Sequence, residues 1–282
     1  MKVERKRRLA IALVALLFVA LTAKAWIDTM AEPSVLRATV TLPQLAPGAP
    51  PIRLALISDI HVSGPDMPPE RLDRIVDQVN ALRPDLVLIA GDFVSDKRAA
   101  TRHYSSAEAI APLSGLRPRL ATVAVPGNHD HWRDVGGVRG ELERRGVVVL
   151  ANAARRFGPL VVGGLDDDYT GHADLRTTLS AMEPLGGAPV LLSHSPDPFP
   201  DLPRAAGLML AGHTHCGQLR YPWGGSPATM SRYGQRYACG LVRENGNVLV
   251  TTAGLGTSVL PFRFGTRPEI RLIKLRAPRR QG

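Results

Sequence analysis

Two histidines separated by one residue stand where a buried strand is expected to end. His213 and His215 follow the apolar run LMLA and the single glycine Gly212. Because side chains alternate along an extended chain, both imidazoles would point to the same side. Paired imidazoles with this orientation are typical of a metal site. A polar surface loop could carry the same pair, so the rest of the chain has to decide between these two interpretations.

Four other apolar runs also lead into Asp, Asn or His. Ligands of open α/β sheets gather at the carboxyl ends of strands, which can lie far apart in the sequence. We therefore expect the residues after these runs to converge with His213 and His215. In chain order, they are Asp59 and His61, Asp92, Asn128 with His129 and Asp130, and His194.

These side chains predict a centre with two metal ions. Carboxylate, imidazole and amide ligands suit divalent ions such as Mn²⁺, Fe²⁺, Zn²⁺ or Co²⁺ better than they suit a structural zinc site. Seven ligands are too many for one ion, but two ions that share a bridging carboxylate would use them all. Such a pair can clamp a phosphoryl group and convert a water to hydroxide. The candidate ligands are Asp59, His61, Asp92, Asn128, His194, His213 and His215.

The elements that must position these ligands alternate between strands and helices in the first half of the chain and are mostly strands in the second. Strands are predicted from short apolar runs and helices from apolar residues at helical spacing. This order predicts a layered α/β domain with two packed sheets and helices outside. The expected helices cover residues 68–84, 105–116, 138–146 and 173–183, and the main strands begin at residues 52, 85, 119, 147, 160, 189, 208, 247 and 269.

The polar blocks resemble a known family. DIHVS, GDFVSD, GNHD, SHSPD and GHTHCGQ occur in the order seen in calcineurin-like metallophosphoesterases, and the resemblance covers about residues 52–276. It implies a four-layer α/β/β/α sandwich that binds two divalent ions, with Mn²⁺ as the leading candidate. It also implies ligand assignments: Asp59, His61 and His215 for one ion, Asn128, His194 and His213 for the other, and Asp92 as the bridge.

The resemblance further assigns His129 as the catalytic histidine. This residue would stabilise the transition state or protonate the leaving oxygen after in-line attack by a metal-bound hydroxide. Asp130 would orient the His129 ring. The alternative for His129 is that it forms hydrogen bonds near the site without contributing to catalysis.

Two stretches, GQLRYPWGG at residues 217–225 and TAGLGTSVLPFRFGTRPEI at residues 252–270, resemble the bacterial membrane-associated phosphodiesterase branch, which includes enzymes acting on UDP-2,3-diacylglucosamine. This resemblance implies hydrolysis of a phosphodiester or pyrophosphate bond in a lipid- or nucleotide-linked substrate. A phosphomonoesterase or protein phosphatase, and a non-catalytic metal-binding scaffold, are the alternatives. The net charge of +10 comes without an interleaved aromatic and basic stripe, so no nucleic-acid partner is expected.

The sequence of the N-terminal residues predicts a membrane-spanning segment. Residues 9–23 are free of charges and follow a basic cluster, so residues 1–27 are expected to form a transmembrane anchor. A cleaved signal is the alternative, because residues 23–25 read A-x-A and Arg7-Arg8 resembles a twin-arginine pair. Either would place the domain on the extracytoplasmic side of the inner membrane, with a cytosolic domain as the less favoured arrangement. Residues 28–51 are predicted as a linker and lead-in strand, and 277–282 as a basic tail.

Several other residues are given secondary roles. Two cysteines imply no disulfide framework, and Cys216 is interpreted as an inert neighbour of His215 rather than a ligand. His131 is expected to be incidental, and residues 166–168 to form a solvated loop or to support the site from outside. The long segment 222–237 could be a lid, a lipid-facing loop or a plain surface loop.

Overall fold

The computed structural model describes residues 2–278, and two six-stranded sheets dominate it. In the first sheet β2, β4, β6 and β7 run parallel, while β14 pairs antiparallel with β2 and parallel with β1. The order is β1 (Ser34–Thr41), β14 (Glu269–Arg276), β2 (Ile52–Ile57), β4 (Leu86–Ala90), β6 (Ala121–Val125) and β7 (Val148–Val149).

The second sheet has a parallel centre and two antiparallel edges. Its order is β12 (Gly240–Glu244), β13 (Asn247–Thr251), β11 (Leu208–Ala211), β10 (Ala188–Leu192), β9 (Leu160–Gly164) and β8 (Ala153–Phe157). The short strands β3 (Ser63–Gly64) and β5 (Arg102–His103) pair separately. Four 3₁₀ turns are η1 (Ala111–Gly115), η2 (Glu183–Leu185), η3 (Phe199–Asp201) and η4 (His215–Gly217).

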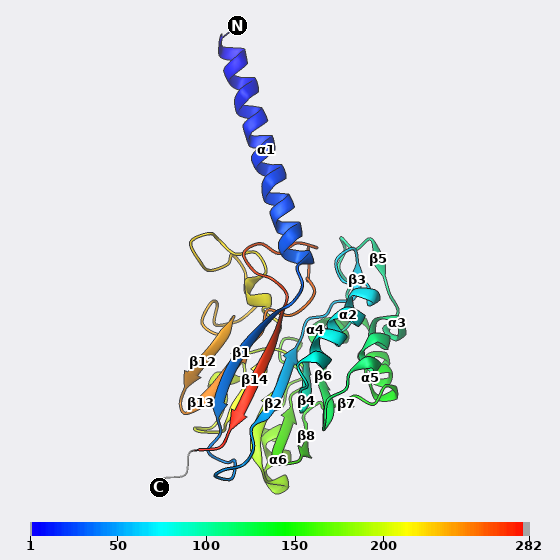
Figure 1. Cartoon of the computed structure of the whole chain (residues 1–282), viewed down its shortest axis with the longest axis vertical. Helices are drawn as coiled ribbons and strands as arrows, with labels where there is room; N and C mark the ends of the chain where they lie inside the picture. The colour runs from blue at the N-terminus through cyan, green and yellow to red at the C-terminus, as the bar shows by residue number, and fades with distance from the viewer. Residues whose placement is uncertain (1, 279–282) are drawn as a thin grey trace.

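The two sheets pack face to face, and helices cover their outer faces (Figure 1). Side chains such as Leu56, Leu88, Leu192 and Leu210 form the core between the sheets. Helices α2 (Pro69–Ala81), α3 (Ser106–Ile110) and α5 (Val135–Arg144) cover the first sheet, and α6 (Leu175–Met182) covers the second. The predicted α/β/β/α sandwich is therefore confirmed.

Helix α2 shows why the sequence pattern found these elements. Its buried residues Leu72, Ile75, Val76 and Val79 recur at helical spacing and pack on the first sheet. Pro69 starts the helix, where a missing backbone N–H costs nothing. In α2, the residues that the helical spacing predicts to be buried are the residues that pack on the first sheet.

Helix α1 (Lys2–Met30) projects from one end of the sandwich (Figure 1). Its mean hydropathy of 2.3 over an 18-residue window makes it long and apolar enough to cross a membrane, by length and composition. The end of α1 is attached to the domain. Arg71 donates to the carbonyl oxygens of Thr29 and Ala31 at 2.9 Å each, and the Arg263 backbone N–H donates to Thr29 Oγ1 at 2.6 Å.

The structure places strand β1 within residues 28–51, the segment predicted as a linker and lead-in strand. Strand β1 pairs along its full length with β14, from Ser34 opposite Glu269 to Thr41 opposite Arg276. It is therefore an edge strand of the first sheet. The sequence alone could not show this, because the partner strand lies at the other end of the domain.

Candidate metal centre

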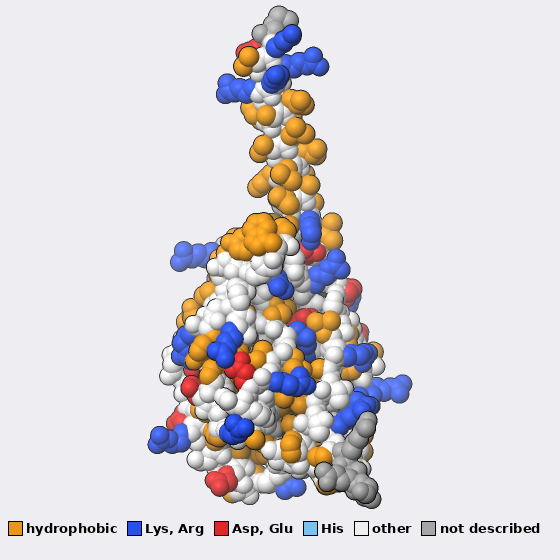
Figure 2. Space-filling view, turned by 90° about the vertical axis from the view of Figure 1, so that its left-hand side faces the viewer, with side chains coloured by type: hydrophobic (Ala, Val, Ile, Leu, Met, Phe, Trp, Pro, Cys, Tyr) orange, Lys and Arg blue, Asp and Glu red, His pale blue; other side chains and the backbone are white. Residues whose placement is uncertain are grey.

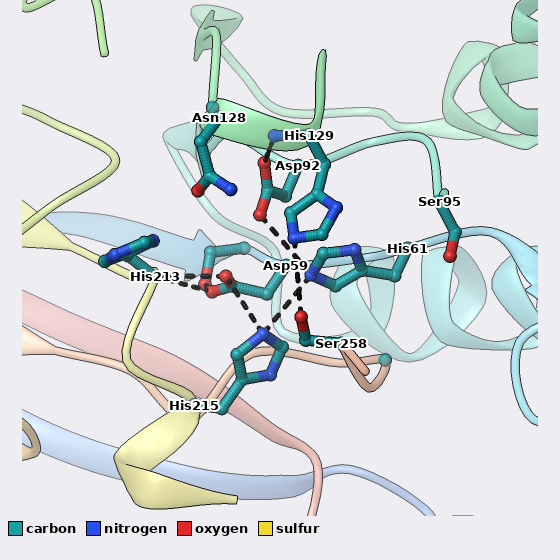
Figure 3. A network of polar contacts seen from close by, with 12 residues as sticks. Asp59, His61, Asp92, Ser95, Asn128, His129, His213, His215 and Ser258 are labelled. Atoms are coloured by element: carbon teal, nitrogen blue, oxygen red, sulfur yellow. Dashed lines mark hydrogen bonds and ion pairs between the residues drawn. The ribbon is translucent and has the colours of Figure 1, made fainter. Parts of the chain in front are cut away.

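The predicted ligands converge at the carboxyl ends of strands from both sheets (Figure 3). The first sheet supplies the residues that follow β2, β4 and β6, and the second supplies those that follow β10 and β11. All of these side chains are buried. In chain order, they are Asp59, His61, Asp92, Asn128 at the start of α4 (Asn128–Arg133), His194, His213 and His215.

The first ligand group consists of Asp59, His61 and His215. The Nε2 atoms of His61 and His215 lie 3.2 Å apart, and His215 Nε2 lies 3.5 Å from Asp59 Oδ1. The His213 backbone N–H donates to the Asp59 carboxylate, which also accepts from the Ser58 hydroxyl. One hydrogen bond from a distant backbone N–H and one from a neighbouring hydroxyl thus hold the Asp59 carboxylate against the two imidazoles.

The residues expected to hold the second ion are Asn128, His194 and His213, and His194 also lies in a possible metal-binding group with Asp59 and Asp92. His194 Nε2 lies 2.9 Å from Asn128 Oδ1 and 3.1 Å from His213 Nδ1. The outer ring nitrogens face carbonyl oxygens: His194 Nδ1 lies 2.7 Å from Ala90 O, and His213 Nε2 lies 3.0 Å from Met230 O. Protons on those outer nitrogens leave His194 Nε2 and His213 Nδ1 with lone pairs directed into the site.

Asp92 lies between the two groups. Its Oδ2 is 3.4 Å from His61 Nε2 and 3.3 Å from His194 Nε2. Its Oδ1 accepts the His129 backbone N–H at 2.9 Å. One carboxylate oxygen therefore faces a histidine of each group, which is the position required of a bridging ligand.

These residues fit two divalent cations. Two imidazole nitrogens about 3.2 Å apart match neighbouring ligands on one ion with bonds of about 2.1 Å. The Nδ1 atoms of His61 and His215 are buried without a hydrogen-bond partner among the described residues. If protons occupy those atoms, both Nε2 lone pairs point into the site. A cation resolves the repulsion between such facing lone pairs.

The electrostatics of the centre also favour cations. Burial, followed by the charge of a neighbouring histidine, lowers the pKa of His61 and His215 well below the usual value and that of His213 to about 3. These rings are therefore neutral ligands at neutral pH. Burial alone would lower the pKa of His194, but the charges of Asp92, Asp59 and Asp167 and the hydrogen bond to Asp92 together outweigh burial and raise that pKa well above its usual value. A cation bound to His194 would therefore displace a proton from this ring. Burial raises the pKa of Asp59 to about 6.

Backbone strain concentrates at the ligands. Five of them have positive φ angles: Asp59 (50°), His61 (48°), Asp92 (59°), His213 (67°) and His215 (49°). Such angles are uncommon outside glycine and persist only where the surrounding structure enforces them. The close packing of Gly127 is one such constraint, because a Cβ at this residue would collide with Asp92 Oδ1. The fold therefore positions these side chains at the expense of an unfavourable backbone conformation at each of the five residues.

His129 and Asp130 do not form the expected pair. The Asp130 carboxylate accepts the backbone N–H groups of Asp92, Phe93, Val94 and Gly127. Asp96 instead holds the His129 ring, with His129 Nδ1 2.5 Å from Asp96 Oδ1. The prediction that Asp130 orients this ring is therefore wrong. Asp130 shapes the loop that carries Asp92, because its side chain points back into the strand ends.

Sequence reasoning missed Asp96, Ser258 and Tyr169. Asp96 is the last residue of the GDFVSD block, so its place in that block was the one available signal. Ser258 Oγ lies 3.3 Å from His129 Nε2. The Tyr169 ring lies 4.7 Å from the His213 ring, centroid to centroid. Ser258 and Tyr169 reach the centre from distant loops, and nothing in their local sequence indicates this.

The acidic run at 166–168 is not a solvated loop, because Asp167 is fully buried and Asp166 and Asp168 are half-buried. Asp166 Oδ1 lies 2.7 Å from His131 Nε2, and the His131 ring stacks on His172 at 4.1 Å. This loop also carries Tyr169, whose ring meets Trp132. It therefore forms one wall of the site, and His131 connects it to α4.

Cys216 and Cys239 form a disulfide across 23 residues, with Cα atoms 4.7 Å apart. This bond corrects the interpretation of Cys216 as an inert neighbour. It ties the turn that carries His215 to the start of β12. The intervening segment includes Met230, whose carbonyl oxygen faces His213.

Comparisons with known proteins agree with this geometry. The sequence profile of the calcineurin-like phosphoesterase family matches residues 52–217. The chain is 32% identical to "Transmembrane protein with metallophosphoesterase domain" of Danio rerio, over 89% of this chain and 59% of that one. It is 30% identical to "Phosphodiesterase YaeI" of Escherichia coli (strain K12), over 80% of this chain and 83% of that one.

A third relative is "Uncharacterized metallophosphoesterase YkuE" of Bacillus subtilis (strain 168), which is 28% identical over 80% of this chain and 79% of its own length. The chain spans about three fifths of the length of the Danio rerio and Bos taurus relatives, at 59% and 64%. The ordered motifs, the two-sheet sandwich and the profile match lead to one conclusion: this chain belongs to the calcineurin-like phosphoesterase family.

Proposed function

We propose that the chain is a dinuclear-metal phosphodiesterase held at a membrane by α1. The observation that carries this proposal is the position of Asp92 Oδ2, 3.4 Å from His61 Nε2 and 3.3 Å from His194 Nε2. Asp59, His61 and His215 would hold one ion, and Asn128, His194 and His213 the other. Mn²⁺ is the ion we expect from the resemblance to the family, and the carboxylate, imidazole and amide ligands suit it as they suit Fe²⁺, Zn²⁺ or Co²⁺.

The residues around the two ions have separable tasks. When bound, the two ions supply Lewis acidity and a hydroxide nucleophile at neutral pH. Asn128 lies within the ligand cluster and His129 lies beside it, so both side chains can contact the oxygens of a phosphoryl group. Asp96 fixes the ring of His129 through Nδ1, which leaves Nε2 to donate a proton to the leaving oxygen. Ser258 holds that Nε2 in place at 3.3 Å.

Two observations support placement on the extracytoplasmic side. Helix α1 carries Lys2, Arg5, Lys6, Arg7 and Arg8 before its apolar stretch, which favours a cytoplasmic N-terminus. The Cys216–Cys239 disulfide suits an oxidising compartment. We therefore propose an anchored enzyme of the inner membrane whose domain faces outward.

The proposed substrate is a phosphodiester or diphosphate that is linked to a lipid or a nucleotide. UDP-2,3-diacylglucosamine belongs to this class, but as a cytosolic precursor it would be the substrate only of a domain that faces the cytoplasm. The printed name of the Escherichia coli relative, a phosphodiesterase, supports the diester. The anchor supports a substrate that resides at the bilayer.

The test compares hydrolysis of an aryl phosphodiester and its matching monoester by the full chain in detergent, with and without Mn²⁺. Asp92→Asn is the matched control. Preference for the diester that is lost in Asp92→Asn would support the proposal. Preference for the monoester would instead indicate a phosphatase. Two bound ions without turnover of either ester, or of UDP-2,3-diacylglucosamine, would favour a metal-binding scaffold.

A further inference from the structure

Two loops beside the base of α1 expose large apolar side chains. Trp223 is 81% exposed and Val259 is 74% exposed, and Tyr221 and Leu260 are also exposed. We call these four residues the apolar rim. Tyr221 and Trp223 stack with their ring planes 4° apart and centroids at 5.2 Å. Figure 2 shows hydrophobic side chains gathered on the domain at the foot of the helix. Such a patch on a soluble surface typically marks an interaction site.

The apolar rim is continuous with the membrane segment. A cavity of about 690 Å³ is lined on one side by α1 and on the other by both loops. Phe18 and Leu21 belong to the apolar stretch of α1, so loops that share a cavity with them lie beside the bilayer. The lining side chains include Phe18, Leu21, Leu219, Tyr221, Leu260 and Phe262.

Basic side chains flank the apolar rim. Lys24 and Arg220 line a neighbouring cavity together with Tyr221 and Phe264. The Lys24 ammonium lies 4.8 Å from the centre of the Phe264 ring. Aromatic rings beside Lys and Arg are typical of the headgroup level of a membrane, where the rings are partly buried and the cations meet lipid phosphates.

We propose that the apolar rim inserts into the headgroup region of the same bilayer that α1 crosses. The occupant of this surface is thus the lipid bilayer, and continuity with α1 argues for it over a second protein. The proposal rests on the membrane anchor of the proposed function, but it does not depend on phosphodiester hydrolysis.

Docking of the rim would orient the metal centre. A second cavity, of about 210 Å³, is lined by the ligand His215 and by Ser258. Leu219, Pro227 and Leu260 line both this cavity and the one beside α1. The inserted rim would therefore place an apolar path between the bilayer and the centre, and the acyl chains of a lipid could lie along this path while its phosphate reaches the centre.

The test uses tryptophan fluorescence of the full chain in vesicles of phosphatidylethanolamine and phosphatidylglycerol. Trp26→Phe with Trp132→Phe leaves Trp223 as the reporter. We expect lipids with a doxyl group near the headgroup to quench most of the Trp223 emission, and aqueous iodide to have little effect. Full access to iodide without quenching by the lipids would overturn the proposal. Protection from both quenchers would indicate contact with protein, and would overturn it too.

A matched variant separates this proposal from the anchor. Trp132→Phe with Trp223→Phe leaves Trp26, which lies at the end of α1 with its ring 6.2 Å from that of Phe262. Quenching of Trp26 by the lipids without quenching of Trp223 would show an anchored chain whose rim stays in water. Quenching of neither would overturn both the anchor and the rim. Circular dichroism of each variant confirms that it folds, and no outcome requires turnover.

Discussion

Nδ1 of His129 lies 2.5 Å from Oδ1 of Asp96, and this contact sets the direction of the other ring nitrogen. Because Asp96 is only four residues after Asp92, one short loop carries both the proposed bridging ligand and the carboxylate that orients the proposed acid. The backbone N–H of His129 closes the arrangement by donating to Asp92 Oδ1 at 2.9 Å. The same few residues would thus position the proposed ions and the proposed proton donor.

Replacing the proposed acid should slow turnover without emptying the centre. His129→Ala is expected to keep both ions and to lower kcat about 10²–10⁴-fold, the usual effect of losing a general acid. The measurement combines kcat with metal content by elemental analysis. Unchanged kcat would limit His129 to a structural role.

Asp96→Asn tests the orienting contact. The amide keeps a polar group beside His129 but loses the carboxylate charge, so we expect kcat to fall by less than in His129→Ala, with KM and metal content unchanged. Asp77→Asn, on the exposed side of α2, is the matched control. Equal activity of the two variants would mean that Asp96 does not position the ring.

Asp92→Asn should affect both ions at once. The substitution preserves the shape of the side chain but removes the charge that two cations would share, so we expect loss of bound metal together with turnover. Metal counting after gel filtration provides the measurement. Normal turnover with two bound ions would refute the bridging assignment.

Chelation should lower thermal stability. Asp59 and Asp92 are buried, and removal of the ions leaves these carboxylates without the charge that compensates for burial. We expect EDTA to lower the Tm and Mn²⁺ to restore it, as followed by circular dichroism. The same treatment should shift the Tm of Asp92→Asn much less. Equal shifts in both proteins would place the effect outside this centre.

Breaking the disulfide should destabilise the domain. Closing a loop of 23 residues is worth about 3 kcal/mol in the chain-entropy account. Cys239→Ser should therefore lower the free energy of unfolding by about that amount. The double variant with Cys216→Ser should be no less stable than the single one, because the bond is already lost. Urea unfolding with and without reductant measures these differences, and insensitivity of the native chain to reductant would argue against the bond.

The sequence by itself determined the layered fold and identified the residues that gather at its strand ends. Short apolar runs bounded by turn residues predict strands, and a polar residue directly after such a run lies at the carboxyl end of its strand. These are local relationships, so they can be read without the partner strands. The helical spacing of Leu72, Ile75 and Val79 is equally local, and α2 follows it.

Only the tertiary structure decided which polar groups pair. Asp130 turns toward the backbone of Asp92, and Asp96 takes the place beside His129. Strand β1 joins the sheet through β14, more than two hundred residues away. The apolar rim lies beside α1 because two late loops fold back to the beginning of the chain. Such contacts depend on how distant segments pack and leave no periodic signal, so the three-dimensional fold alone sets them.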